Sequence, residues 1–140
     1  AKQYGLTRAE LMEVRCAACH TGLEPVEGMP LLNAAKERVF DCIDCHRVPG
    51  LEPADKPTAP DLTRVGEKHP TQYVFPEGWN GEATVLRWHI EHFLDPRAMS
   101  PESGMTRFPM TEKEAAGLAL LVMSWKRQSL PVAWLPAQED

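Results

Sequence analysis

The sequence predicts a mostly α-helical fold in which short helices are joined by long loops. Two segments carry a capping box, the reciprocal pattern that begins many helices: Thr7–Glu10 and Thr111–Glu114. After the second box, apolar residues recur at the helical spacing of three and four. Proline is frequent, with 13 in the chain and six of them at positions 47–80, which indicates long stiffened connections rather than regular elements.

The first two expected helices each lead into a pair of cysteines. One spans residues 8–19, and Leu6 and Leu11 are placed to pack across its start as a hydrophobic staple. The other spans about 34–45, with apolar residues at helical spacing. Glycines and prolines make residues 21–31 between them a loop.

The second half of the chain contains two more expected helices. Residues 47–80 are expected to form a long loop with one short β-like run at 72–75. Loops of this length are uncommon in small domains, and a cofactor that forms part of the core would explain this one. A third helix is expected at about 82–94, ending before Pro96. The last helix extends from the second capping box to about Arg127.

Length and charge limit the functional classes. The 140 residues provide one compact unit, which we divide into an N-terminal helix and loop (1–30), a main helical domain (31–128) and a tail (129–140). A net charge of −5 argues against nucleic acid as a partner, because phosphate binding needs a basic surface. No apolar run approaches the ~18 residues of a transmembrane helix.

The four cysteines form two pairs, and a histidine directly follows each pair. The motifs read Cys16-Ala17-Ala18-Cys19-His20 and Cys42-Ile43-Asp44-Cys45-His46. Cys-x-x-Cys-His is the attachment motif of c-type haem, in which both thiols bond to one porphyrin. The imidazole that follows binds the iron as an axial ligand. The sequence therefore predicts two covalently attached haem c groups, with His20 and His46 as proximal ligands.

Other uses of paired cysteines explain less of the pattern. Four thiolates at this spacing are close to a zinc ribbon, and two disulfides are a further alternative, but both leave His20 and His46 unexplained. A thioredoxin-like redox pair needs a strand before the motif, and none is predicted.

Covalent haem predicts an exported location. Haem is attached to such motifs outside the cytoplasm, so we expect a periplasmic or otherwise exported protein. The chain starts at Ala1 without a hydrophobic leader, which fits a signal peptide already removed.

From about Leu31 to Arg127 the order of signals resembles a class I cytochrome c domain. The segments that carry the resemblance are residues 39–41 before the second motif, the run Ala59 to Gly66, the run Trp88 to Arg97, Ser103-Gly104-Met105, and the closing helix with Trp125. The resemblance implies a helical domain whose long loops wrap the second haem. The first haem, outside the resemblance, is then an addition on the N-terminal helix.

The resemblance also implies roles for single residues around the second haem. Met105 becomes the distal ligand opposite His46, and the backbone carbonyl of Pro60 orients the His46 imidazole. The family usually has proline directly after the ligand methionine, whereas Thr106 stands here.

Several nearby side chains have a second interpretation. Met99 and Met110 are weaker candidates for the distal ligand, and core packing is the better interpretation of both. Trp88, Trp79 and Tyr73 have two interpretations. They contact a haem, by packing on the macrocycle or by donating a hydrogen bond to a propionate, or they only pack in the core.

The distal ligand of the first haem is predicted from the third helix. His89 lies on one side with Trp88 and His92, and apolar residues including Ile90 cover another side, so we expect this helix to lie between two haems. We predict His89 as the ligand, because the family usually has an apolar residue there. The alternatives are His69, His92 and Met29.

These expectations favour a dihaem electron-transfer protein without catalytic residues. One alternative is an electron-relay subunit of a larger respiratory, sulfur or nitrogen oxidoreductase complex, including a membrane-associated one, with the apolar tail 130–135 as a docking segment. Another is a small haem enzyme, if the first iron has an open position. The acidic chain, with its haem propionates, predicts a redox partner with a basic docking face.

Overall fold

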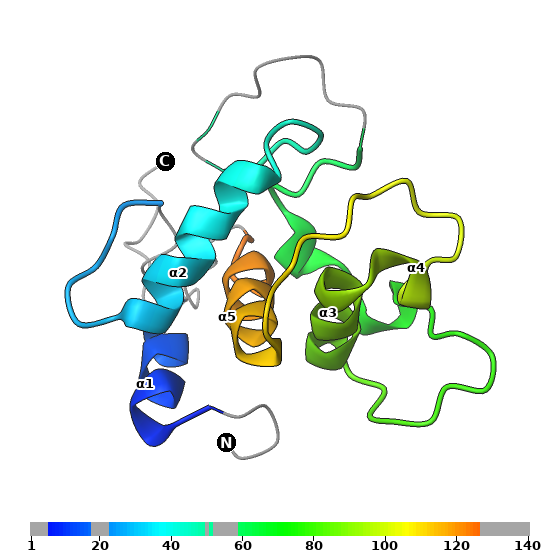
Figure 1. Ribbon diagram of the computed structural model, residues 1–140, viewed down its shortest axis with the longest axis horizontal. Coiled ribbons are helices and arrows are strands. Elements are labelled where there is room, and N and C mark those ends of the chain that lie inside the picture. Colours follow the sequence, from blue (N-terminus) through cyan, green and yellow to red (C-terminus); the bar gives the residue numbers. More distant parts are fainter. Residues whose placement is uncertain (1–5, 18–22, 50, 52–58, 127–140) are drawn as a thin grey trace, which may run out of the picture.

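The computed structural model describes residues 6–17, 23–49, 51 and 59–126 (Figure 1). Within these residues the regular structure is helical, apart from one isolated antiparallel bridge between Val48 and Leu51. The α-helices are α1 (Arg8–Ala17), α2 (Pro30–Arg38), α3 (Val85–Leu94), α4 (Pro96–Met99) and α5 (Glu112–Met123). The predicted mostly α fold is confirmed. None of the described helices has the length and hydropathy to cross a membrane.

Helix α5 forms the centre of the core, with α2 on one side and α3 on the other (Figure 1). Its buried residues include Ala115, Ala116 and Ala119, all fully buried, and these small side chains let both neighbours approach closely. Gly117 serves the same purpose, since a Cβ there would lie 3.0 Å from the Leu31 side chain of α2. Helix α1 packs against α2 and α5.

Both predicted capping boxes are present. Thr7 N donates to Glu10 Oε2 and Glu10 N donates to Thr7 Oγ1, each at 3.2 Å. At the start of α5, Thr111 N donates to Glu114 Oε1 at 3.0 Å, and Glu114 N donates to Thr111 Oγ1 at 3.1 Å. Leu6 is buried as a hydrophobic staple requires, whereas the Leu11 side chain lies outside the described residues.

Helix α2 differs from its prediction at both ends. It begins at Pro30 rather than near residue 34, because proline at the first helical position needs no amide partner and already has the helical φ. It ends at Arg38 and gives way to a 3₁₀ helix, Val39–Asp41. The second motif therefore follows the helix instead of lying on its last turns.

The region after residue 59 also departs from the prediction in detail. The β-like run at 72–75 is not a strand: a 3₁₀ helix, Pro70–Gln72, occupies its start, and a second one lies at Val65–Glu67. Helix α3 begins at Val85, capped by Thr84, whose Oγ1 accepts from Arg87 N at 3.1 Å. Asp95 and Pro96 end α3 and also start the unpredicted helix α4, because an aspartate cap followed by proline is a helix start.

Gly66 joins the long loop to the end of α5. Its N–H donates to the carbonyl oxygen of Trp125 at 2.8 Å. A Cβ at this position would collide with the carbonyl oxygen of Met123 and lie 2.9 Å from that of Trp125. Both obstacles are backbone atoms, so no rotamer change can relieve them.

We therefore expect Gly66→Ala to lower the free energy of unfolding by about 1–3 kcal/mol, the usual cost of overpacking. Gly104→Ala is the matched control, since nothing lies within 4 Å of a Cβ there. Denaturant unfolding of both variants measures the difference, and equal stabilities would show that the contact between Gly66 and α5 is not tight.

Candidate functional site

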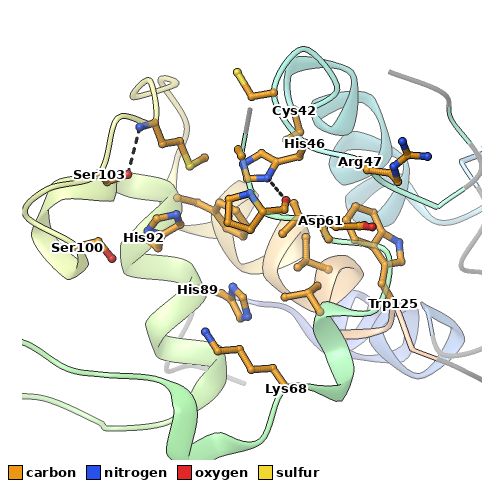
Figure 2. Close-up of a pocket in the computed structure, with 18 of the residues that line it drawn as sticks. Cys42, His46, Arg47, Asp61, Lys68, His89, His92, Ser100, Ser103 and Trp125 are labelled. Carbon is orange, nitrogen blue, oxygen red and sulfur yellow. Dashed lines mark hydrogen bonds between the residues drawn. The ribbon is translucent and has the colours of Figure 1, made fainter. Parts of the chain in front are cut away.

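A cavity of about 1180 Å³ lies beside α3, between the second cysteine motif and the loop after α4 (Figure 2). Its walls come from residues 41–47, 59–65, part of α3, the loop 100–108 and the end of α5. The volume exceeds the usual range of about 300–1,000 Å³ for small-molecule pockets. Elements far apart in the sequence thus enclose a space for a large ligand.

Both cysteines and the histidine of the second motif line this cavity. Cys42, Cys45 and His46 are brought together by one turn, in which His46 N donates to the carbonyl oxygen of Cys42 at 2.9 Å. Both thiols are free. Burial raises the pKa of Cys42 to about 11, and the nearby Asp41 and Cys45 act in the same direction, so this thiol is protonated at neutral pH.

The His46 ring is oriented by a backbone carbonyl. Its Nδ1 lies 2.7 Å from the carbonyl oxygen of Pro60 (Figure 2). A carbonyl oxygen only accepts, so Nδ1 carries a hydrogen, and in the neutral ring Nε2 then keeps its lone pair. A ring N–H held by a carbonyl is the usual second contact of a metal-binding histidine. The contact that the resemblance implied is present, and iron ligation by His46 stays a prediction.

Met105 is the methionine that the cavity favours. Among the methionines that the structure describes, Met105 is the one that lines the cavity, and its backbone N donates to Ser103 Oγ at 3.2 Å. Met99 is buried in the core, and Met110 packs against the core from outside the cavity. The geometry therefore prefers Met105 to the two weaker candidates.

Helix α3 contributes Trp88, His89 and His92 to the opposite part of the wall. The His92 ring stacks on Trp88, with centroids 4.8 Å apart and planes 16° apart. His89 is buried, and its Nε2 lies 3.0 Å from the hydroxyl oxygen of Tyr73. Figure 2 shows both histidines extending from α3 toward the cavity.

Both α3 histidines are neutral at neutral pH. Burial lowers the pKa of His89 to about 4, and the charges of His92 and Lys68 act in the same direction. Burial also lowers the pKa of His92 to about 4, helped by the charges of His46 and Lys68. Each ring therefore keeps one nitrogen lone pair and one N–H at neutral pH.

The prediction that α3 lies between two haems is wrong for its apolar side. Ile90 is fully buried and belongs, with Phe93, to the core that packs against α5. Two apolar faces mark a helix between buried partners, but the sequence pattern does not distinguish a protein partner from a cofactor. One partner of α3 is the cavity, and the other is α5.

The predicted ligands of the first haem are dispersed. His89 lines the cavity of the second motif, whereas α1, which carries Cys16, lies on the far side of α5 from α3 (Figure 1). Cys19 and His20 lie outside the described residues, so ligation of a first haem by His89 stays a prediction. In the described residues, His89 lies in the wall of the cavity that the second motif also lines.

The alternative ligands also occupy different places. His69 is exposed and caps the 3₁₀ helix Pro70–Gln72, where its Nδ1 accepts from Thr71 N at 3.2 Å. Met29 is the residue before α2 and packs against the hydrophobic core. His92, by contrast, lines the same cavity as His46.

Two buried nitrogen atoms in the cavity wall have no hydrogen-bond partner: His92 Nδ1 and Trp125 Nε1. The Pro96 backbone raises the pKa of His92, against the lowering effect of burial. Trp125 is 2% exposed, and from the sequence it is expected only as part of the closing helix. Both nitrogen atoms are covered by protein atoms, so a group bound in the cavity does not reach them without movement of the wall.

The donor set of the cavity fits a covalently attached haem. It offers two thiols, the imidazoles of three histidines and a thioether. The described residues contain no cluster of three or more His, Cys, Asp or Glu side chains that could hold a metal ion. Haem iron needs no such cluster, because the protein supplies only axial ligands.

Comparisons with protein families, with curated proteins and with solved structures found no match for this chain.

We expect the Tyr73–His89 contact to stabilise the fold through hydrogen bonding. Tyr73→Phe removes the hydroxyl and leaves a buried ring nitrogen unpaired, which should cost about 1–3 kcal/mol. In a His89→Leu background the same change should cost much less, since the partner is already gone. A double-mutant cycle by denaturant unfolding measures this coupling, and additive effects would contradict the contact.

Proposed function

We propose that the chain is a dihaem c-type cytochrome, built on a class I cytochrome c-like domain, that transfers electrons between redox partner proteins in the periplasm or another exported location. The observation that supports this most is the second motif, whose two thiols and imidazole line one large cavity with Met105. The hydrogen bond from His46 Nδ1 to the Pro60 carbonyl adds to it, because it directs the lone pair of Nε2 away from the backbone.

In this proposal each residue of the second site has one task. Cys42 and Cys45 attach the haem covalently, His46 is the proximal ligand and Met105 the distal ligand. When bound, the haem supplies a reversible one-electron change at iron. Apolar side chains of the wall, such as Val122 and Phe93, exclude water from it. Methionine–histidine ligation gives a higher potential than two histidines would, so the second haem is the high-potential site.

The first haem is proposed from the Cys16–His20 motif. Its attachment mirrors that of the second: Cys16 and Cys19 bind the porphyrin, and His20 is the proximal ligand. With a histidine as its distal ligand, it would be the low-potential haem. Electrons would then enter at the first haem and leave from the second.

Ligation distinguishes a carrier from an enzyme. If both irons have two protein ligands, neither offers an open position to a substrate, and the protein passes electrons without transforming a small molecule. For this reason we propose no catalytic residues.

The proposed two-site carrier makes a spectroelectrochemical prediction. The purified haem-loaded protein should titrate in two separate steps, and its reduced spectrum should not change with carbon monoxide. A single step would contradict two unlike haems. A carbon monoxide complex in the unmodified protein would reveal an open iron and contradict the carrier proposal.

The role of Met105 is tested by comparing two methionines. Met105→Ala should open the second iron to carbon monoxide and lower the higher midpoint potential, since it removes the thioether ligand. Met110→Ala is the matched control, because Met110 is half-buried against the core but lies outside the cavity wall. Carbon monoxide binding by the Met110 variant alone would assign the ligand to Met110.

A further inference from the structure

The beginning of α2 lacks a side-chain cap of its own. Met29 occupies the capping position and makes no side-chain hydrogen bond there, and Pro30 follows as the first helical residue. The next amides, of Leu31 and Leu32, are buried and have no partner within the helix, as for the first turn of any α-helix. They need acceptors from another part of the chain.

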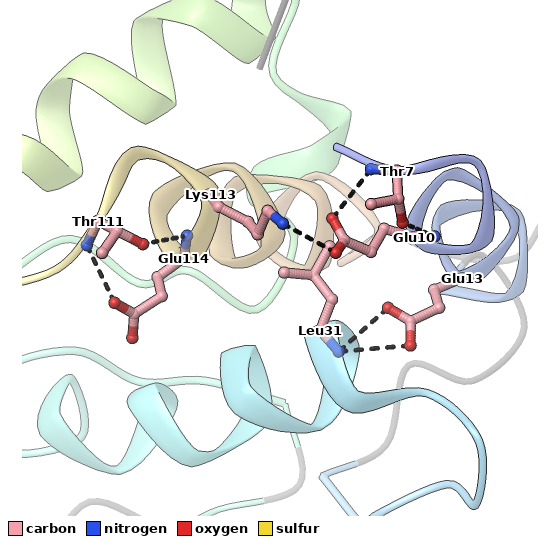
Figure 3. A network of polar contacts seen from close by, with 7 residues as sticks. All are labelled: Thr7, Glu10, Glu13, Leu31, Thr111, Lys113 and Glu114. Carbon is pink, nitrogen blue, oxygen red and sulfur yellow. Dashed lines mark hydrogen bonds and ion pairs between the residues drawn. The ribbon is translucent and has the colours of Figure 1, made fainter. Parts of the chain in front are cut away.

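A glutamate of α1 supplies the acceptors. Both carboxylate oxygens of Glu13 receive the N–H of Leu31, at 3.3 and 3.1 Å (Figure 3). The amide of Leu32 also acts on this carboxylate. Glu13 is only 6% exposed. It therefore caps α2 from a separate helix, 18 residues earlier in the chain.

A second carboxylate of α1 binds the other neighbouring helix. Glu10, one turn before Glu13, forms an ion pair with Lys113 of α5 at 3.0 Å and also closes the capping box with Thr7 (Figure 3). This outer pair is partly exposed and contributes little by itself. Glu13 makes a buried contact between α1 and α2, so losing it leaves the buried N–H of Leu31 without this acceptor.

We infer that Glu13 is a positioning residue that fixes the helix of the first cysteine motif against the helix leading into the second. Cys16 lies three residues after Glu13 on α1, and α2 is followed directly by the 3₁₀ turn before Cys42. The functional part of the inference rests on the proposed function: if both motifs carry haem, Glu13 fixes one haem relative to the other.

Glu13 acts through its oxygen acceptors more than through its charge. Burial raises the pKa of Glu13, while the amides of Leu31 and Leu32 act in the opposite direction without cancelling it. Burial of the charge is therefore unfavourable, and the hydrogen bonds to the amides are what the fold uses. Glutamine keeps an acceptor oxygen of the same reach without the buried charge.

The test compares Glu13→Ala, Glu13→Gln and a control in the haem-loaded protein. Hydrogen exchange at the Leu31 amide should become about fivefold faster or more in Glu13→Ala, as for loss of a helix cap. Glu13→Gln should keep the wild-type protection. Glu37→Ala, which removes an exposed glutamate of α2, should also leave exchange unchanged.

Electron exchange between the haems gives the functional readout. Glu13→Ala should make it slower and no longer single-exponential, because α1 then takes several positions, whereas Glu13→Gln should restore the wild-type rate. Wild-type exchange at Leu31 in Glu13→Ala would overturn the inference. Loss of Leu31 protection in Glu13→Gln would also overturn it, even if the alanine variant does not fold.

The hydrogen-exchange and electron-exchange measurements distinguish failure of this inference from failure of the proposed function. A protein without haem at the first motif would contradict the proposed function, while the exchange of the Leu31 amide would still decide whether Glu13 caps α2. Two haems whose electron exchange is the same in Glu13→Ala as in the wild type would overturn the positioning role alone.

Discussion

The close packing of α5 between α2 and α3 is the constraint on which the rest of the structure depends. Small residues on α5 (Ala115, Ala116, Gly117 and Ala119) allow both neighbours to approach its backbone. The second motif follows α2, while His89 and His92 project from α3, so this packing sets the width of the cavity between them. Gly66 fixes the remaining wall by hydrogen bonding to the end of α5.

Local patterns predicted the parts of this architecture that depend on a few neighbouring residues. The capping boxes at Thr7 and Thr111 are present as expected, because their hydrogen bonds join residues three apart. The contact between His46 and Pro60 followed from the family resemblance, which carries long-range information that spacing alone lacks. The first turn of α2 is capped by Glu13, and no local sequence pattern predicts a partner 18 residues away.

The partners of α3 show the same limit more sharply. Two apolar sides were visible in the sequence, but helix periodicity cannot say which side meets α5 and which meets a cavity. The sequence also could not predict that His92 Nδ1 and Trp125 Nε1 lack hydrogen-bond partners, because the partners of a buried polar atom depend on tertiary contacts. The cavity now unites Met105, predicted for the second haem, with His89, predicted for the first.

Covalent attachment of two haems is the central claim, and the mass of the intact protein under denaturing conditions tests it most directly. Only thioether-bound haem survives denaturation, so the natively produced wild-type chain should carry the mass of two haems. Cys16→Ala/Cys19→Ala and Cys42→Ala/Cys45→Ala should each carry one. A wild-type mass without added haem, or with zinc lost on denaturation, would contradict the account.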